Sequence, residues 1–177
     1  MTRALKNAGI TMGILLIALL TTPCGFAGER APQGADRIER QEDARPAHAR
    51  GLVGSWDVEV TLRQCASGAA IRTFQSLGTY MTGGTMIDST SGTAQALKTP
   101  GQGEWRHLGG PAYEFAFKSF TFDAAGNFTG WTKIVHVATM DPSGESYSSE
   151  GSLEVYAPNG TLVFTGCAST TATRYQY

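Results

Sequence analysis

The strongest constraint on the fold is a strict alternation of apolar and polar side chains between residues 56 and 63. Every second residue there is apolar, and the residues between them are Asp, Glu, Thr and Arg. Successive side chains of a β-strand point to opposite faces, so a period of two indicates a strand with one buried and one solvated face. The side chains assigned to the buried face are Trp56, Val58, Val60 and Leu62.

Seven further segments have strand-like composition, and none after residue 51 has helical periodicity. They are 70–82, 84–91, 102–107, 112–123, 127–140, 145–156 and 161–175. Their connections are short and rich in Gly, Asn, Asp and Pro, which is typical of turns between antiparallel neighbours. We therefore predict an all-β domain of eight antiparallel strands in up-and-down order, closed into a barrel without exposed edges. A two-sheet sandwich is the alternative, although only the connection 92–101 is long enough to cross between sheets.

Residues 1–27 have the pattern of a cleavable signal peptide. Two basic residues precede an apolar run at 10–20, which is shorter than the about 20 residues that a membrane span needs. Small residues follow, so we predict cleavage after Ala27. A proline directly before Cys24 fits a lipoprotein motif poorly, and we expect no lipid anchor there. The predicted location is the periplasm or the extracellular space, with no stable membrane span.

The segment 28–50 differs in composition from the rest of the chain. It holds five acidic and five basic residues, and its only large aliphatic residue is Ile38. Such a segment buries too little apolar surface to offset its ordering entropy, which predicts a flexible charged leader before a domain at 51–177. Removal of residues 1–27 takes away two basic residues and no acid, so the net charge changes from −1 to −3 (−1 − 2). This mildly acidic net charge does not indicate the basic surface that nucleic-acid binding requires.

Two cysteines, Cys65 and Cys167, remain after the predicted cleavage. A pair of cysteines in an oxidising compartment usually forms a disulfide. Two buried free thiols are the alternative.

The tripeptide Gly54-Ser55-Trp56 opens the first predicted strand, and Arg174 lies in the last one. This pattern resembles the G-x-W motif of the calycin superfamily, which includes lipocalins, fatty-acid-binding proteins and their bacterial relatives. In that superfamily a basic residue near the last strand packs over the tryptophan and plugs one end of the barrel. The resemblance therefore implies a lipocalin-like barrel plugged by Trp56 and Arg174. An ordinary core tryptophan and a solvated arginine are the alternatives.

The same residues allow a test of barrel closure. If the first and last strands are antiparallel neighbours, the residue numbers of opposed pairs have a constant sum. Trp56 and Arg174 sum to 230, and Cys65 and Cys167 sum to 232. The two pairs imply one register within two residues, which favours closure, and a bulge near Cys65 would absorb the difference.

Charged residues identify the outer face of most predicted strands, and the residues between them are assigned to the interior. The segments 70–82 and 84–91 mix polar and apolar residues on both faces, so the inward assignment of Tyr80 and Met86 has no charge to guide it. Later, Phe120 and Phe122 break the alternation, which predicts a bulge or a strand end near Ser119.

An eight-stranded barrel either fills with side chains or holds one small ligand. The predicted interior mixes aromatic with small residues, which favours a cavity for a planar or lipid-like ligand, and a packed aromatic core is the alternative. The predicted ligand-binding residues are Val58, Val60, Tyr80, Tyr113, Phe115, Phe117, Thr132, His136, Tyr147 and Leu153.

The candidate catalytic residues are His136, Tyr80 and Tyr113. A buried neutral histidine can act as a general base or bind a polar group of a ligand. A core histidine satisfied by Ser, Thr or backbone is the alternative, and it is the one that we favour. The three histidines are not at ligand spacing, so we predict no metal site. No phosphate-binding glycine loop is present, and we expect no cofactor.

Three functions fit this sequence. The first is an exported, lipocalin-like carrier of a small hydrophobic or aromatic molecule. The second, by resemblance to small calycin-like cyclases of the allene oxide cyclase kind, is an enzyme that cyclises or isomerises a hydrophobic substrate. The third resembles periplasmic protease inhibitors of similar shape, in which the leader 28–50 would contact a protein partner. The residues do not decide between enzyme and carrier, and they do not indicate the oligomeric state.

Overall fold

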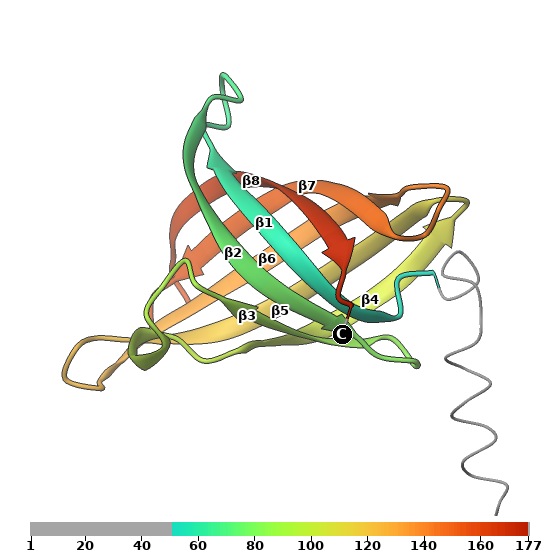
Figure 1. Ribbon diagram of the computed structural model, residues 1–177. Coiled ribbons are helices and arrows are strands. Elements are labelled where there is room, and N and C mark those ends of the chain that lie inside the picture. The colour runs from blue at the N-terminus through green and yellow to red at the C-terminus, as the bar shows by residue number, and fades with distance from the viewer. Residues whose placement is uncertain (1–50, 177) are drawn as a thin grey trace, which may run out of the picture. The chain divides into compact units, whose positions relative to one another are not determined.

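The computed structural model describes residues 51–176. The predicted signal peptide, with Cys24, and the predicted leader 28–50 lie outside these residues. The described chain forms eight antiparallel strands in sequence order that close into a barrel, as predicted (Figure 1). The strands are β1 (Gly54–Arg63), β2 (Ala70–Tyr80), β3 (Thr85–Thr90), β4 (Gly101–Gly109), β5 (Ala112–Phe122), β6 (Phe128–Met140), β7 (Ser146–Tyr156) and β8 (Leu162–Arg174), with a 3-10 helix η1 (Gln95–Leu97) before β4.

Turn chemistry explains the up-and-down order. Gly83 and Gly84 connect β2 to β3, and both have positive φ, 99° and 93°. The N–H of Gly84 donates to the carbonyl of Met81 at 3.2 Å, so Gly83 is the second central residue of this turn, where a positive φ favours glycine. In the turn between β5 and β6, the carboxylate of Asp123 accepts hydrogen bonds from the backbone N–H groups of Ala125 and Asn127, each at 2.9 Å. Tight turns of this kind make consecutive strands antiparallel neighbours, and the closure of the eight strands into one barrel rules out the sandwich alternative.

Closure occurs between β1 and β8 in the predicted register. Trp56 lies opposite Arg174, and the ladder continues without a shift to Arg63 opposite Cys167. Cys65 and Cys167 form a disulfide with a Cα–Cα distance of 5.2 Å. The predicted bulge near Cys65 is absent from this ladder, and the irregularity next to it, between Leu62 and Arg63, is in the pairing of β1 with β2. Cys65 lies beyond the end of β1, so the turn absorbs the two-residue difference.

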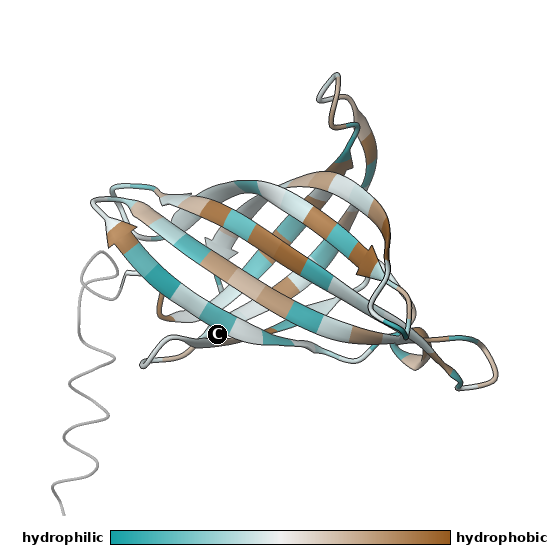
Figure 2. Ribbon diagram, turned by 180° about the vertical axis from the view of Figure 1, so that it is seen from behind, coloured by the Kyte–Doolittle hydropathy of each residue, from teal (hydrophilic) through white to brown (hydrophobic). Residues whose placement is uncertain are grey.

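The interior and exterior of the barrel follow the period of two. Figure 2 shows hydrophilic and hydrophobic residues alternating along the strands. The predicted bulge or strand end near Ser119 is wrong, because β5 continues through that residue with Ser119 buried and Phe120 on the outside, 47% exposed. The irregularity lies between Thr121 and Phe122, where β5 pairs with β6. The two outer phenylalanines pack against Phe128 instead of the interior.

One end of the barrel is closed by Trp56 and Arg174. The indole ring is fully buried, and its Nε1 donates to the carbonyl of Leu52 at 2.9 Å. The guanidinium carbon of Arg174 lies 4.2 Å from the centre of the indole ring. Its nitrogens donate to the carbonyls of Gly51, Val53 and Gly144 at 2.8–2.9 Å. A charged side chain is therefore held over the tryptophan by backbone acceptors, and this arrangement is called the plug below.

Candidate functional site

A cavity of about 270 Å³ lies inside the barrel. Seven of the eight strands and the segment 91–100 contribute to its lining, and β4 does not. The lining is mostly apolar, with a few polar groups on separate strands. Ligand pockets have this composition, and their usual volume is about 300–1,000 Å³. The cavity therefore suits a small molecule.

A larger hollow of about 660 Å³ lies against the outer face of the barrel. It is open to solvent, and much of its lining consists of outward-facing polar side chains, among them Asp57, Glu59 and Gln75. Surface hollows of this kind bury little of a ligand, whereas binding pockets bury most of it. The interior cavity is therefore the candidate site.

Most of the predicted ligand-binding residues line this cavity. They are Val58, Val60, Tyr80, Phe115, Phe117, Thr132, His136, Tyr147 and Leu153. Met86, assigned to the interior with Tyr80, also lines it. Tyr113 does not, because it lies two residues beyond Phe115 toward the plug. Its ring packs there against His107, with ring centres 4.7 Å apart. The structure thus separates Tyr113 from the other two candidate catalytic residues.

Two tyrosines form a hydroxyl pair near the plug. The hydroxyl oxygens of Tyr80 and Tyr147 lie 3.1 Å apart, and both side chains are buried. The ring of Tyr147 also packs edge-on against Trp56, with ring centres 4.9 Å apart. Burial raises the pKa of both tyrosines above its ordinary value. The pair therefore supplies neutral hydroxyl groups, already hydrogen-bonded to one another, at this end of the cavity.

His136 lies on β6 in the wall of the cavity. Its Nδ1 is 2.8 Å from the hydroxyl of Ser149, which in turn lies 2.5 Å from the hydroxyl of Thr170. Burial lowers the pKa of His136 to about 4, so the ring is neutral near pH 7. Its Nε2 is buried and has no hydrogen-bond partner among residues 51–176. The ring thus has one satisfied nitrogen and one free nitrogen.

A serine hydroxyl in contact with a histidine ring nitrogen, as in Ser149 and His136, is a pair of groups that can act as a nucleophile and its general base. Ser149 is buried, however, and it is not among the residues that line the cavity. A ligand in the cavity meets the His136 ring and not the serine hydroxyl behind it. We therefore interpret the Ser149 hydroxyl as a group that positions the ring.

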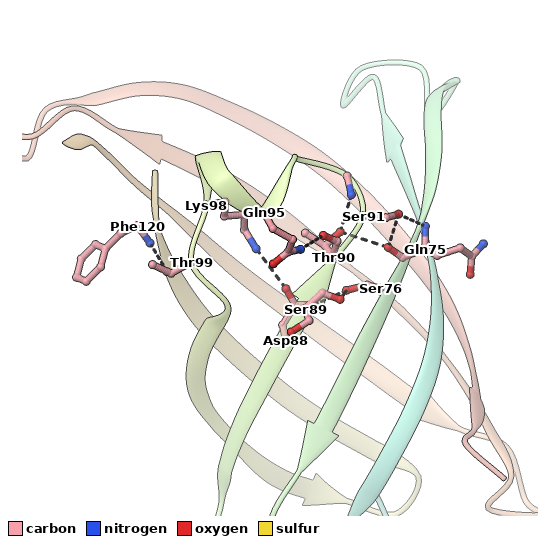
Figure 3. A network of polar contacts seen from close by, with 11 residues as sticks. Gln75, Ser76, Asp88, Ser89, Thr90, Ser91, Gln95, Lys98, Thr99 and Phe120 are labelled. Atoms are coloured by element: carbon pink, nitrogen blue, oxygen red, sulfur yellow. Dashed lines mark hydrogen bonds and ion pairs between the residues drawn. The ribbon is translucent and has the colours of Figure 1, made fainter. Parts of the chain in front are cut away.

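A buried carboxylate lies on β3, toward the end of the barrel opposite the plug (Figure 3). Oδ2 of Asp88 is 2.5 Å from the hydroxyl of Ser76, and its Oδ1 is 3.5 Å from Nζ of Lys98. Burial raises the pKa of Asp88, and the contacts with Ser76 and Lys98 act in the opposite direction. Sequence analysis missed this cluster. Counting by two from Met86 would have placed Asp88 inside.

Lys98 belongs to the segment 91–100, which connects β3 to β4. The backbone N–H of Thr99 donates to the carbonyl of Phe120 at 3.0 Å, and Phe120 N–H donates to the Thr99 hydroxyl at 3.0 Å. On the other side, the Gln95 amide donates to the carbonyl of Thr90 at 3.0 Å (Figure 3). The segment is therefore tied to β3 and β5, and Gly92, Thr93 and Lys98 form part of the cavity wall.

No group of three or more His, Cys, Asp or Glu side chains within residues 51–176 is arranged to hold a metal ion. In the same part of the chain no helix has the length and apolar character needed to cross a membrane.

Comparison with known proteins gives a structural likeness at low sequence identity. No protein-family model matches the chain, and no curated protein matches it. Among solved structures, the crystal structure of Rv2717c from M. tuberculosis is similar over 75% of this chain and 99% of that chain. The sequence identity is 12% and the TM-score is 0.36.

Proposed function

We propose that this protein is a lipocalin-like carrier that holds a small, mostly apolar molecule inside its barrel. The observation that carries the proposal is the cavity of about 270 Å³, lined by apolar side chains and a few separated polar groups. Protein interiors are normally packed as densely as organic crystals, so empty space of this size is not expected in a purely structural core. A carrier needs such an empty volume to hold its ligand.

The cavity exists because small residues lie among the aromatic ones. Gly78, Ala168 and Thr170 face the interior together with Phe115 and Phe117. A larger side chain at any of the three small positions would occupy the volume that is now open. The distribution of side-chain size therefore supports a binding role for the interior.

The proposed location is outside the cytoplasm. Disulfides persist mainly in oxidising compartments, and the Cys65–Cys167 bridge fits such a location. The predicted signal peptide at 1–27 points to the same compartment. A carrier in that location would take up its ligand from the periplasm or the medium.

Filling the cavity tests this function. The purified protein would be titrated with 2-methylnaphthalene, with tryptophan fluorescence as the signal, and native mass spectrometry would show any ligand that co-purifies. Ala168→Phe places a large ring in the cavity, and Thr165→Phe places the same ring on the exposed face of the same strand. We expect saturable binding by the wild type and the Thr165→Phe variant, with affinity at least about tenfold lower for Ala168→Phe.

Two results would overturn the proposal. One is the absence of saturable binding by the wild type together with no co-purified molecule. The other is an Ala168→Phe variant that is folded and binds the probe as tightly as the wild type.

A further inference from the structure

We propose that the cavity selects a neutral ligand that carries a hydroxyl group, such as a phenol or an alcohol, and that this hydroxyl binds Nε2 of His136. This inference rests on the proposed carrier function, because it concerns the same cavity, and it adds the chemical class of the ligand.

The imidazole ring of His136 is held in one orientation. Its Nδ1 contacts Ser149 at 2.8 Å. Its Cδ2 lies against Gly151, the residue opposite His136 on β7, where a Cβ atom would collide with the ring. The ring of Phe115 stacks on it, with centres 5.5 Å apart and planes inclined by 27°. Both ring atoms next to Cγ thus rest on β7, and the ring itself is part of the cavity lining.

Nε2 is the buried side-chain atom of this cavity wall that has no hydrogen-bond partner in the described part of the chain. The hydroxyls of Tyr80 and Tyr147 bind one another, and Asp88 contacts Ser76 and Lys98. Besides Nε2, one other buried side-chain atom among residues 51–176 lacks a partner, the hydroxyl of Ser119, and it does not line the cavity. A buried polar group without a hydrogen bond is destabilising and rare, so a group that awaits a ligand is a specific feature.

The chemistry of Nε2 indicates a hydroxyl partner. A neutral imidazole carries its proton on one nitrogen, and the contact of Nδ1 with a serine is compatible with either tautomer. A hydroxyl both donates and accepts, so it satisfies Nε2 in either case. A carboxylate at Nε2 would need a positive partner there, and burial keeps His136 uncharged near pH 7. The two cations of the lining, Arg72 and Lys98, already contact the Gly92 carbonyl and Asp88. A neutral hydroxyl is thus the simplest group that completes this wall.

The surroundings of His136 fit the apolar part of such a ligand. Two residues along β6 from His136, Ile134 lies between Phe117 on β5 and Leu153 on β7. These three side chains also line the cavity. A flat or branched apolar body can rest on them while its hydroxyl reaches Nε2. The site would therefore distinguish a hydroxylated compound from a hydrocarbon of the same shape.

A matched pair of probes tests the inference. 2-Naphthol and 2-methylnaphthalene have nearly the same shape and differ in one hydroxyl. We expect the wild type to bind 2-naphthol at least about tenfold more tightly than 2-methylnaphthalene at pH 7. His136→Leu should remove this preference, so that the variant binds the two probes with affinities within about threefold of one another. The control is His107→Leu, which replaces an exposed histidine outside the cavity and should retain the preference.

A second measurement does not depend on the folding of a variant. In the wild type, the ¹⁵N chemical shift of Nε2 of His136 should change when 2-naphthol is added and stay constant with 2-methylnaphthalene. Equal affinity for both probes, or an unchanged Nε2 resonance on binding of 2-naphthol, would overturn the hydroxyl inference and leave the carrier function intact. Failure of both probes to bind would instead overturn the carrier function, and this inference with it.

Discussion

The plug and the cavity differ in how their buried polar groups are paired. At the plug, Arg174 binds three backbone carbonyls and covers Trp56, whose own N–H is bound by Leu52. In the cavity, Nε2 of His136 is unpaired, and the Asp88–Lys98 contact of 3.5 Å joins β3 to a connecting segment. The first region is a completed network, and the second retains one unpaired atom, Nε2 of His136, that a ligand can satisfy.

This difference predicts which substitutions change the stability of the fold and which change ligand binding. A fully satisfied buried network loses a large amount of stability when one member is removed, because the remaining members lose their partners. A group without a protein partner has less to lose, and its replacement should change ligand affinity more than the fold. We therefore expect substitutions near the plug to act on unfolding, and substitutions around His136 to act on binding.

The largest expected effect is at the plug. Trp56→Ala should lower the free energy of unfolding by about 3–5 kcal/mol, because it removes a fully buried ring and uncovers Arg174. The matched control is Trp131→Ala on the outer face, where the indole is only half-buried against Tyr156 and Lys118. Urea unfolding measures both variants. Equal losses would show that the plug has no special role in stability.

Acid should destabilise the protein through His136. The pKa of this residue is about 4 in the folded chain and about 6.5 in an unfolded one. The unfolded state then binds more protons between these values, so stability is complete above pH 6.5 and is lost as the pH falls toward 4. The 2.5-unit difference corresponds to about 3 kcal/mol.

Unfolding by urea at several pH values measures this loss. Burial also raises the pKa of Asp88, so the quantity to follow is the difference between the wild type and His136→Gln. That difference should change by about 3 kcal/mol between pH 7 and pH 4. A constant difference would mean that the His136 environment does not suppress its protonation. His107→Gln is the control, since it alters an exposed histidine.

The fold could be predicted from the sequence because outer charges and turn residues recur on most strands. The alternation from Trp56 to Arg63 defines β1, and the pairs Trp56–Arg174 and Cys65–Cys167 define how β1 meets β8. These are local patterns with long-range consequences, since one register fixes the inward face of both strands. The same logic placed His136 in the interior.

The prediction was weakest where interior positions are themselves polar. Along β2 and β3 the inward residues include Ser76, Asp88 and Thr90, so the hydrophobic alternation that marks a buried face is absent. Tyr113 is buried as predicted and lies outside the cavity for another reason. Alternation identifies the face of a strand but not the depth along the barrel, and depth decides whether a side chain meets the plug or the cavity.

The smallest expected effect is at the cluster of Asp88, Ser76 and Lys98 in the cavity wall. Lys98→Met keeps an apolar stem and removes the charge near Asp88. Burial already raises the pKa of Asp88 and Lys98 lowers it, so the substitution should raise this pKa further. We expect a loss of only about 1 kcal/mol at pH 7, because the carboxylate can take up a proton instead of staying charged.

The raised pKa of Asp88 determines how the stability loss of Lys98→Met should change with pH. A carboxylate with a raised pKa binds a proton more readily in the folded state, so its contribution to stability grows as the pH falls. The loss caused by Lys98→Met should therefore shrink between pH 7 and pH 5, opposite to the trend at His136. Lys118→Met, on the outer face against Trp131, is the control and should show no such recovery. A loss of several kcal/mol in the free energy of unfolding that persists at pH 5 would show that the Asp88–Lys98 pair is as integral to the fold as the plug. The contrast between the plug and the cavity would then be lost.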